Sequence, residues 1–273
     1  MINFSHKNKG CETMNKGINL YCYSGLEECD LETSAALMKE NGFTKTFWMS
    51  DAGVITEKNA SLLLQYGIAF DTLHAPFNTI NDIWKNDDSG EYTLKQHTNG
   101  IDKCVEVGAP TLIVHLSSGC PEPRITDAGN RRFDALMEYA RKKNIKIAYE
   151  NQRYIANLTY AIEQYDDAGF CWDTGHESCF THGKRFMPMV GERLCALHLH
   201  DNHGVYNSDE HLLPYDGSID FDYVALTIAE SGFEGALMLE VARYNSKVYD
   251  NITAEEYYRL AGNAASRLDE TIA

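Results

Sequence analysis

The chain has 273 residues, of which 44% are hydrophobic and 23% are charged, the composition of an ordinary globular protein. It contains no apolar stretch long enough to cross a bilayer, so we expect no insertion in a membrane. Its formal net charge is -16, from 40 acidic and 24 basic residues. No basic patch is visible, and such a charge repels a polyanion, so nucleic acid is not an expected partner.

The N-terminal segment, residues 1–17, is polar and lacks the apolar centre of a secretory signal. We interpret it as a loosely ordered lead-in to a single catalytic domain over residues 18–273. The eight cysteines include no C-x-x-C pair, and several lie inside apolar runs, where a cysteine packs as a small hydrophobic residue. These features indicate a reduced compartment, and we expect a cytoplasmic protein.

One pattern repeats along the chain: a short apolar run, a polar residue at its end, a loop and then a helical segment. It predicts strands at residues 18–24, 44–50, 69–74, 111–116, 145–150, 170–173, 194–200 and 236–241. It predicts helices at residues 31–41, 57–66, 94–107, 128–143, 158–166, 184–190, 221–230 and 254–268. The strands are apolar at nearly consecutive positions, as in a parallel sheet covered on both faces. The sequence therefore predicts one α/β domain, a single (β/α)₈ TIM barrel.

An open, doubly wound sheet uses the same βα units and is the alternative fold. Such a sheet usually carries a glycine-rich phosphate loop after its first strand. Residues 25–29 read Gly-Leu-Glu-Glu-Cys instead, without the G-x-G-x-x-G pattern. The closed barrel is therefore favoured.

Six of the predicted strands end in residue types that bind metals: His74, His115, Glu150, Asp173, His198 and Glu240. A parallel barrel gathers its strand ends at one mouth, so these distant residues should converge. Each of them alone is more often a hydrogen-bonded interior residue, but six at the same position of a repeated unit indicate a shared role. Crowded carboxylates repel one another unless a cation lies between them. The pattern therefore predicts a bound divalent metal.

Further polar residues extend this predicted site. His176 ends the phrase D-T-G-H that follows the sixth strand, and the turn can fold it back toward the mouth. Asp209 and His211 lie in the loop after the seventh strand, where a solvated acidic turn is the alternative. His200 can share the strand face of His198, so spacing leaves open which of the two binds metal. We predict that the remaining histidines lie at the surface: His6, His97, His182 and His203.

With these residues assembled, the chain resembles the xylose isomerase-like TIM barrel superfamily. This grouping holds sugar-phosphate isomerases and epimerases together with the endonuclease IV type of abasic-site nuclease. The resemblance covers residues 18–268. Its most specific motifs are W-D-T-G-H at residues 172–176, H-L-H-D at residues 198–201, and the phrase D-x-H-x-x-x-x-x-G-x-I-D at residues 209–220.

The resemblance implies two metal arrangements. The ketose-epimerase pattern implies one catalytic metal, held by Glu150, Asp173, His198 and Glu240. It selects His198 over His200 as the ligand, and it implies that His176 binds substrate or supports the ligands. The endonuclease IV pattern implies three zinc ions and adds the ligands His74, His115, His176, Asp209 and His211.

The chain also departs from the ketohexose epimerases of this superfamily. These carry a second Glu where this chain has Ala156, and an Arg where this chain has Gly204. The Gly-Glu-Gly common after the D-x-H phrase reads Tyr-Asp-Gly at residues 215–217. The resemblance therefore does not imply the usual hexose substrate.

The leading hypothesis is a metal-dependent isomerase or epimerase of a sugar or sugar phosphate, using Zn²⁺ or Mn²⁺. The metal would stabilise an enediolate, Glu150 and Glu240 would exchange the proton, and His176 would orient a hydroxyl or act as a secondary acid. We expect Trp48 and Trp84 to pack in the core, although either could add an apolar wall to the pocket. The competing hypotheses are a multi-zinc phosphoesterase of endonuclease IV type and a non-catalytic sugar-binding protein. Substrate, metal number and oligomeric state, a homo-oligomer included, are left open.

Overall fold

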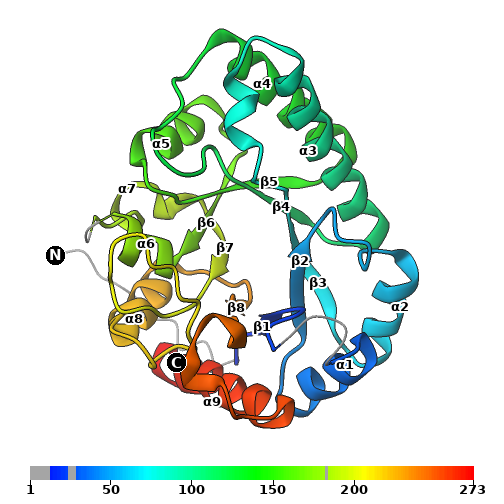
Figure 1. Ribbon diagram of the computed structural model, residues 1–273, viewed down its shortest axis with the longest axis vertical. Coiled ribbons are helices and arrows are strands. Elements are labelled where there is room, and N and C mark those ends of the chain that lie inside the picture. Colours follow the sequence, from blue (N-terminus) through cyan, green and yellow to red (C-terminus); the bar gives the residue numbers. More distant parts are fainter. Residues whose placement is uncertain (1–12, 24–28, 182–183) are drawn as a thin grey trace, which may run out of the picture.

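A ring of parallel strands surrounded by helices makes up the fold (Figure 1). The computed structural model describes residues 13–23, 29–181 and 184–273. The strands are β1 (Lys16–Asn19), β2 (Lys45–Met49), β3 (Ala69–His74), β4 (Thr111–Val114), β5 (Lys146–Glu150), β6 (Gly169–Asp173), β7 (Leu194–His198) and β8 (Leu237–Leu239). The helices are α1 (Leu31–Glu40), α2 (Glu57–Gln65), α3 (Asp88–Val107), α4 (Asp127–Lys143), α5 (Ile155–Gln164), α6 (Thr174–Phe180), α7 (Met187–Val190), α8 (Phe221–Ser231) and α9 (Ala254–Ile272). Short 3₁₀ helices are η1 (Ile80–Trp84), η2 (Gly191–Arg193), η3 (Arg243–Asn245) and η4 (Lys247–Tyr249).

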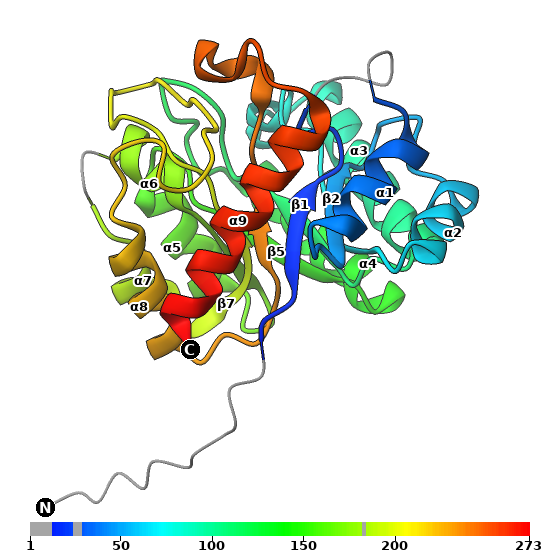
Figure 2. The same cartoon turned by 90° about the horizontal axis from the view of Figure 1, so that it is seen from below.

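The strands form a nearly closed barrel, which confirms the predicted fold. Their order is β7-β6-β5-β4-β3-β2-β1-β8, with parallel pairing between neighbours. Between β7 and β8 the ring is completed by one isolated parallel bridge, from Leu199 to Leu239. There the Leu199 N–H donates to the Met238 carbonyl oxygen at 2.9 Å, and the Glu240 N–H donates to the Leu199 carbonyl oxygen at 3.1 Å. The loops that follow β7 and β8 lie on the same side of the barrel (Figure 2).

Helices α3 and α6 depart furthest from the sequence prediction. Helix α3 begins at Asp88 rather than near Leu94, because the Asp87 carboxylate accepts the Ser89 N–H and caps a first turn that has no apolar periodicity. Helix α6 occupies residues where only a turn was expected. The Asp173 carboxylate accepts the His176 N–H at 2.6 Å and so starts α6 directly at the end of β6.

The apolar core has an outer and an inner part. The outer part fills the space between the strands and the helices, and α9 lies beside β1 on the outside of the ring (Figure 2). The inner part contains small clusters, one of Ile113, Ala148, Cys171 and Ala196, the other of Phe47, Ala236 and Met238. Among helices in the described ranges, none has the length and apolar character needed to cross a membrane.

His97 is buried, with 1% of its surface exposed, so its predicted surface position is wrong. It shares the inward face of α3 with Ile101 and Cys104, four and seven residues further on, which is the spacing of one helical face. His203 is exposed, as predicted. The predictions for His6 and His182 fall outside the described residues. Burial lowers the pKa of His97 from 6.5 to about 4.

We predict that His97 makes the fold sensitive to acid. Because its folded pKa lies below its unfolded value, the unfolded chain takes up the proton first, and the free energy of unfolding falls as pH drops below 6.5. The free energy of unfolding, measured with urea, should therefore fall between pH 7 and pH 5 by about 2 kcal/mol less in His97→Gln than in the unaltered chain. His203→Gln is the matched control and should behave like the unaltered chain. Equal pH dependence in all three proteins would contradict the prediction.

Candidate metal centre

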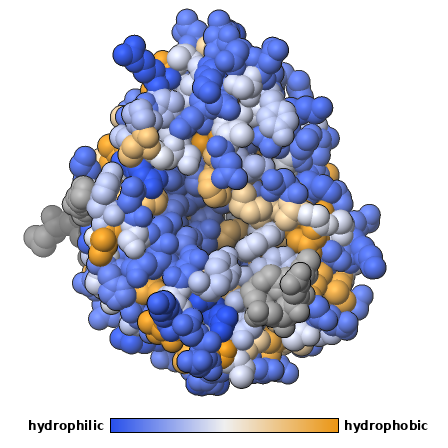
Figure 3. Space-filling view, viewed as in Figure 1, coloured by the Kyte–Doolittle hydropathy of each residue, from blue (hydrophilic) through white to orange (hydrophobic). Residues whose placement is uncertain are grey.

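The candidate ligands stand on the inward face of the barrel, two residues beyond its inner cluster. Side chains alternate along a strand, so His115, Glu150, Asp173 and His198 share the face of Ile113, Ala148, Cys171 and Ala196. His74 ends β3, and Glu240 directly follows β8. The strand ends thus deliver all six predicted side chains to one face. That face is hollowed at its centre, with hydrophilic residues around much of the hollow (Figure 3).

Four of these residues could hold a single metal ion. Glu150, Asp173, His198 and Glu240 each offer a ligand atom, and these atoms lie within 4.8 Å of one another. Nδ1 of His198 is 3.0 Å from Oε2 of Glu240. The two atoms are not aligned as donor and acceptor, and neither has another hydrogen-bond partner in the described part of the chain. Leaving such buried atoms unpaired is costly, and a cation between them would satisfy both, so the residues fit a divalent metal.

A second group shares the Glu150 carboxylate. Oε2 of Glu150 lies 3.0 Å from Nε2 of His74 and 2.9 Å from Nε2 of His115. The two imidazole nitrogens are 3.2 Å apart. Oε1 of the same carboxylate lies 3.0 Å from Nδ1 of His176. Glu150 therefore stands between the first group and a second group that is richer in nitrogen.

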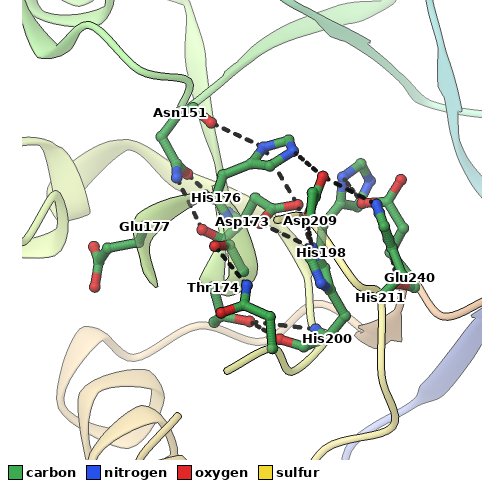
Figure 4. Close-up of polar contacts among 12 residues, drawn as sticks. Asn151, Asp173, Thr174, His176, Glu177, His198, His200, Asp209, His211 and Glu240 are labelled. Atoms are coloured by element: carbon green, nitrogen blue, oxygen red, sulfur yellow. Dashed lines mark hydrogen bonds and ion pairs between the residues drawn. The ribbon is translucent and has the colours of Figure 1, made fainter. Parts of the chain in front are cut away.

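The third predicted set also comes together. Oδ2 of Asp209 lies 3.2 Å from Nε2 of His176 and 3.2 Å from Nε2 of His211 (Figure 4). Nδ1 of His211 contacts the backbone carbonyl oxygen of Glu240 at 2.9 Å, which fixes the orientation of the ring. The loop after β7 is thus part of the site and not a solvated turn. The structure brings the nine predicted residues into one cluster, and their role as ligands stays a prediction.

His200 lies behind this cluster and orients Asp173. It is fully buried, and its Nε2 lies 3.1 Å and 3.2 Å from the two carboxylate oxygens of Asp173. Its ring stacks on that of His211, with centroids 4.1 Å apart. A Cβ atom on Gly175 would overlap the His200 ring, so the glycine of the D-T-G-H phrase makes room for this histidine. With His211 and Glu240, His200 also forms a group able to hold a metal.

Sequence reasoning missed several neighbours of the ligands. The Asn151 amide donates to the carbonyl oxygen of Asp173 at 2.8 Å, and its oxygen accepts the Asp173 N–H at 2.8 Å. Nε2 of Gln152 lies 3.1 Å from Nε2 of His115 and 2.9 Å from Nδ1 of His176. Both residues directly follow Glu150, and that adjacency was the only available signal.

The apolar wall of the pocket comes from residues that the sequence did not point to. Phe77 and Phe180 line the pocket at the site, which has a volume of about 300 Å³. Trp84 is buried and donates its indole N–H to the Leu116 carbonyl oxygen, the core role considered for it. Trp48 lines a separate, neighbouring pocket. Phe77 lies in the loop after β3 and Phe180 ends α6, and the sequence pattern reveals neither the course of that loop nor this helix.

Carboxylates and imidazoles balance their charges in the metal-free chain. Burial raises the pKa of Glu150, but its contacts with the imidazoles of His115 and His198 outweigh burial and hold that pKa well below its usual range. Burial lowers the pKa of His211, but Asp209 more than offsets this and raises it to about 9. Protonated imidazoles thus compensate the buried carboxylates. A divalent cation would take over that role and release protons.

The chain belongs to the family described as xylose isomerase-like TIM barrel, whose model matches residues 27–262. This confirms the resemblance seen in the motifs. The uncharacterised protein y4fM of Sinorhizobium fredii is 27% identical over 285 residues, covering 88% of this chain and 89% of its own length.

Two solved structures share the fold. D-psicose 3-epimerase from Clostridium cellulolyticum, solved with D-tagatose, superposes with a TM-score of 0.75 at 12% identity, covering 95% of this chain and 99% of its own. The IolI protein, solved with a zinc atom, superposes with a TM-score of 0.74 at 16% identity, covering 95% of this chain and 99% of its own. At these identities the likeness shows the fold alone.

We predict that Gly175→Ala weakens metal binding. The added methyl group displaces the His200 ring, and Asp173 loses the contact that orients it. Loss of such an outer contact typically costs about 10- to 100-fold in metal affinity. Titration calorimetry with Mn²⁺ and with Zn²⁺ measures this loss. Gly53→Ala is the matched control because a Cβ there meets open space. Equal affinity in both variants would refute the role given to His200.

Proposed function

We propose that the protein is a metal-dependent isomerase or epimerase of a sugar or sugar phosphate. The observation that carries this proposal is the set of four ligand atoms, from Glu150, Asp173, His198 and Glu240, lying within 4.8 Å of one another. This set stands beside a pocket of about 300 Å³, at the lower end of the range for small-molecule sites. Sugar epimerases among the structural neighbours agree with this class of reaction.

The donor atoms bear on which metal would bind. One imidazole and three carboxylates make an oxygen-rich set that suits Mn²⁺, whereas His74 and His115 with Glu150 make a set that suits Zn²⁺. A divalent cation held there would supply Lewis-acid polarisation of a carbonyl oxygen. We therefore propose Mn²⁺ or Zn²⁺ as the cofactor, with Glu150, Asp173, His198 and Glu240 as its ligands.

Glu240 and Glu150 are our candidates for proton transfer. Both line the pocket, and Glu240 is the more accessible, with 20% of its side chain exposed against 1% for Glu150. Burial raises the pKa of Glu240, but the charge of His198 outweighs burial and lowers that pKa well below the usual range. Both carboxylates are therefore ionised at neutral pH and able to accept a proton. Because they come from different strands, one could remove a proton and the other return it on an adjacent carbon.

His176 is our candidate for orienting a substrate hydroxyl or acting as a secondary acid. It lines the pocket next to Glu150 and Asp209. Burial lowers its pKa, but the charges of Asp173 and Asp209 outweigh burial and raise it well above the usual range. The imidazole is therefore protonated at neutral pH in the metal-free chain and able to donate a hydrogen bond. The partner that we propose is a small sugar in the cytoplasm, with no nucleic acid and no membrane involved.

The proposed reaction can be tested by solvent exchange. Metal-loaded protein in D₂O should incorporate deuterium into a ketose or sugar phosphate, detected by NMR across a broad panel. Glu240→Gln keeps the size of the side chain but removes the base, so exchange should fall by about 10²- to 10⁴-fold. Glu230→Gln, an exposed change on α8, is the control and should retain exchange. No exchange with any sugar of the panel would count against the proposal.

A second candidate function is hydrolysis of a phosphate ester by several zinc ions. The group of His74, His115 and Glu150, which adjoins the first group through Glu150, is the observation that favours it. The net charge of -16 disfavours a DNA substrate, because binding its backbone requires basic contacts.

Metal content separates the two functions. We predict one ion per chain, by elemental analysis, in protein prepared without chelators and active in deuterium exchange. Three zinc ions per chain, together with cleavage of abasic DNA or a small phosphate ester, would establish the hydrolase instead.

A further inference from the structure

A single arginine, Arg153, lines the same pocket as the candidate metal ligands. It lies three residues after Glu150, at the beginning of the segment that leads from β5 into α5, and it is half-buried. The sequence analysis gave it no role. Ser118 and Asn207 stand beside it in the pocket wall, while the carboxylates of that wall belong to the metal cluster.

The guanidinium of Arg153 is held in one orientation by neutral groups. Its Nε and Nη2 donate to Oδ1 of Asn207 at 3.0 Å and 2.7 Å. Its central carbon lies 3.6 Å from the centroid of the Phe180 ring, a close cation–π contact. Asn207 is itself fixed, because its N–H donates to the Cys179 carbonyl oxygen at 3.1 Å and its backbone is left-handed, with φ of 64°. The side chain is thus positioned without being neutralised.

Arg153 has no carboxylate partner in the described part of the chain, although the pocket that it lines holds several carboxylates. Within residues 13–23, 29–181 and 184–273 it makes no ion pair, and its Nη1 makes no hydrogen bond. Five other arginines of that part pair with carboxylates: Arg132, Arg141, Arg185, Arg193 and Arg259. Four others make no such pair there, but they do not line this pocket: Arg124, Arg131, Arg243 and Arg267. Carboxylates are plentiful in a chain with net charge -16. Arg153 nevertheless faces the pocket with only an amide as its hydrogen-bond partner, so its positive charge is available to a bound ligand.

We infer that Arg153 binds an anionic group, a phosphate or a carboxylate, carried by the sugar substrate. This inference rests on the proposed function, because it names the class of substrate for the same pocket. A planar guanidinium fits the oxygens of either group through paired hydrogen bonds, and Nη1 is available for them. The Glu150, Asp209 and Glu240 carboxylates that line the pocket would repel an anion, and Arg153 offsets that repulsion at the pocket wall.

Matched ligands test this inference by direct binding. Calorimetry on the Mn²⁺-loaded protein compares D-tagatose with D-tagatose 6-phosphate and D-tagaturonate, which differ only at the terminal carbon. We expect one of the charged sugars to bind roughly tenfold tighter or better than D-tagatose, because hydrogen bonds to a charged group are strong. The charged sugar with the greater advantage identifies phosphate or carboxylate as the natural group.

Two variants remove the charge in different ways. Arg153→Gln deletes the charge. Asn207→Asp neutralises it, because a carboxylate then accepts the hydrogen bonds of the guanidinium. Asp tolerates the left-handed backbone conformation of residue 207. Both should abolish the advantage of the charged sugar, measured in each variant as the ratio of its affinity to that of D-tagatose. Arg131→Gln removes an exposed arginine of α4 and should keep the advantage. Melting temperatures identify any variant that fails to fold. If Arg153→Gln fails to fold, the isosteric variant Asn207→Asp still tests the inference.

The outcomes separate this inference from the proposed function. Equal affinity for all three sugars, or an advantage that survives both variants, overturns the inference even if deuterium exchange is found. An advantage that depends on Arg153 supports the inference even if no exchange occurs. Binding of none of the three sugars overturns it together with the proposed sugar site.

Discussion

The burial of ionised carboxylates at the strand ends is the constraint on which the rest of this structure depends. Glu150 and Asp173 are almost completely shielded from water, where an unpaired charge is expensive. Imidazoles from neighbouring strands offset this cost in the metal-free chain, and a divalent cation would do so more completely. Closure of the barrel is part of this arrangement, because the bridge between Leu199 and Leu239 brings Glu240 next to His198.

Asp173 connects the site to its scaffold. The same carboxylate accepts the His176 N–H in the first turn of α6 and contacts the His200 ring, so its position is set by a helix and by a buried imidazole together. Asn151 joins the ends of β5 and β6 through two hydrogen bonds with the Asp173 backbone. The position of Asp173 is therefore determined by the surrounding scaffold, which includes a helix start, a buried imidazole and an amide at the end of the neighbouring strand. Arg153 differs from the buried carboxylates in this respect: its guanidinium is held in one orientation by Asn207, but no carboxylate of the described chain balances its charge.

The repeated βα pattern in the sequence predicts most of the fold, including the positions of the candidate ligands at the strand ends. Every predicted strand overlaps an observed one, because buried parallel strands leave continuous apolar runs in the sequence. Helix α6 was not predicted, because its start depends on a hydrogen bond from His176 to Asp173 and not on periodicity. The burial of His97 follows from its place on the apolar face of α3, whereas the pocket positions of Phe77, Phe180 and Arg153 depend on tertiary contacts. A single sequence contains no local signal for such contacts.

Anomalous diffraction from crystals of the protein grown with Mn²⁺ would test the central claim most directly, because it locates the ion without relying on activity. The account predicts a peak in the anomalous difference map in contact with Glu150, Asp173, His198 and Glu240 together. A fully occupied peak elsewhere, or no peak while these four side chains point apart, would contradict it.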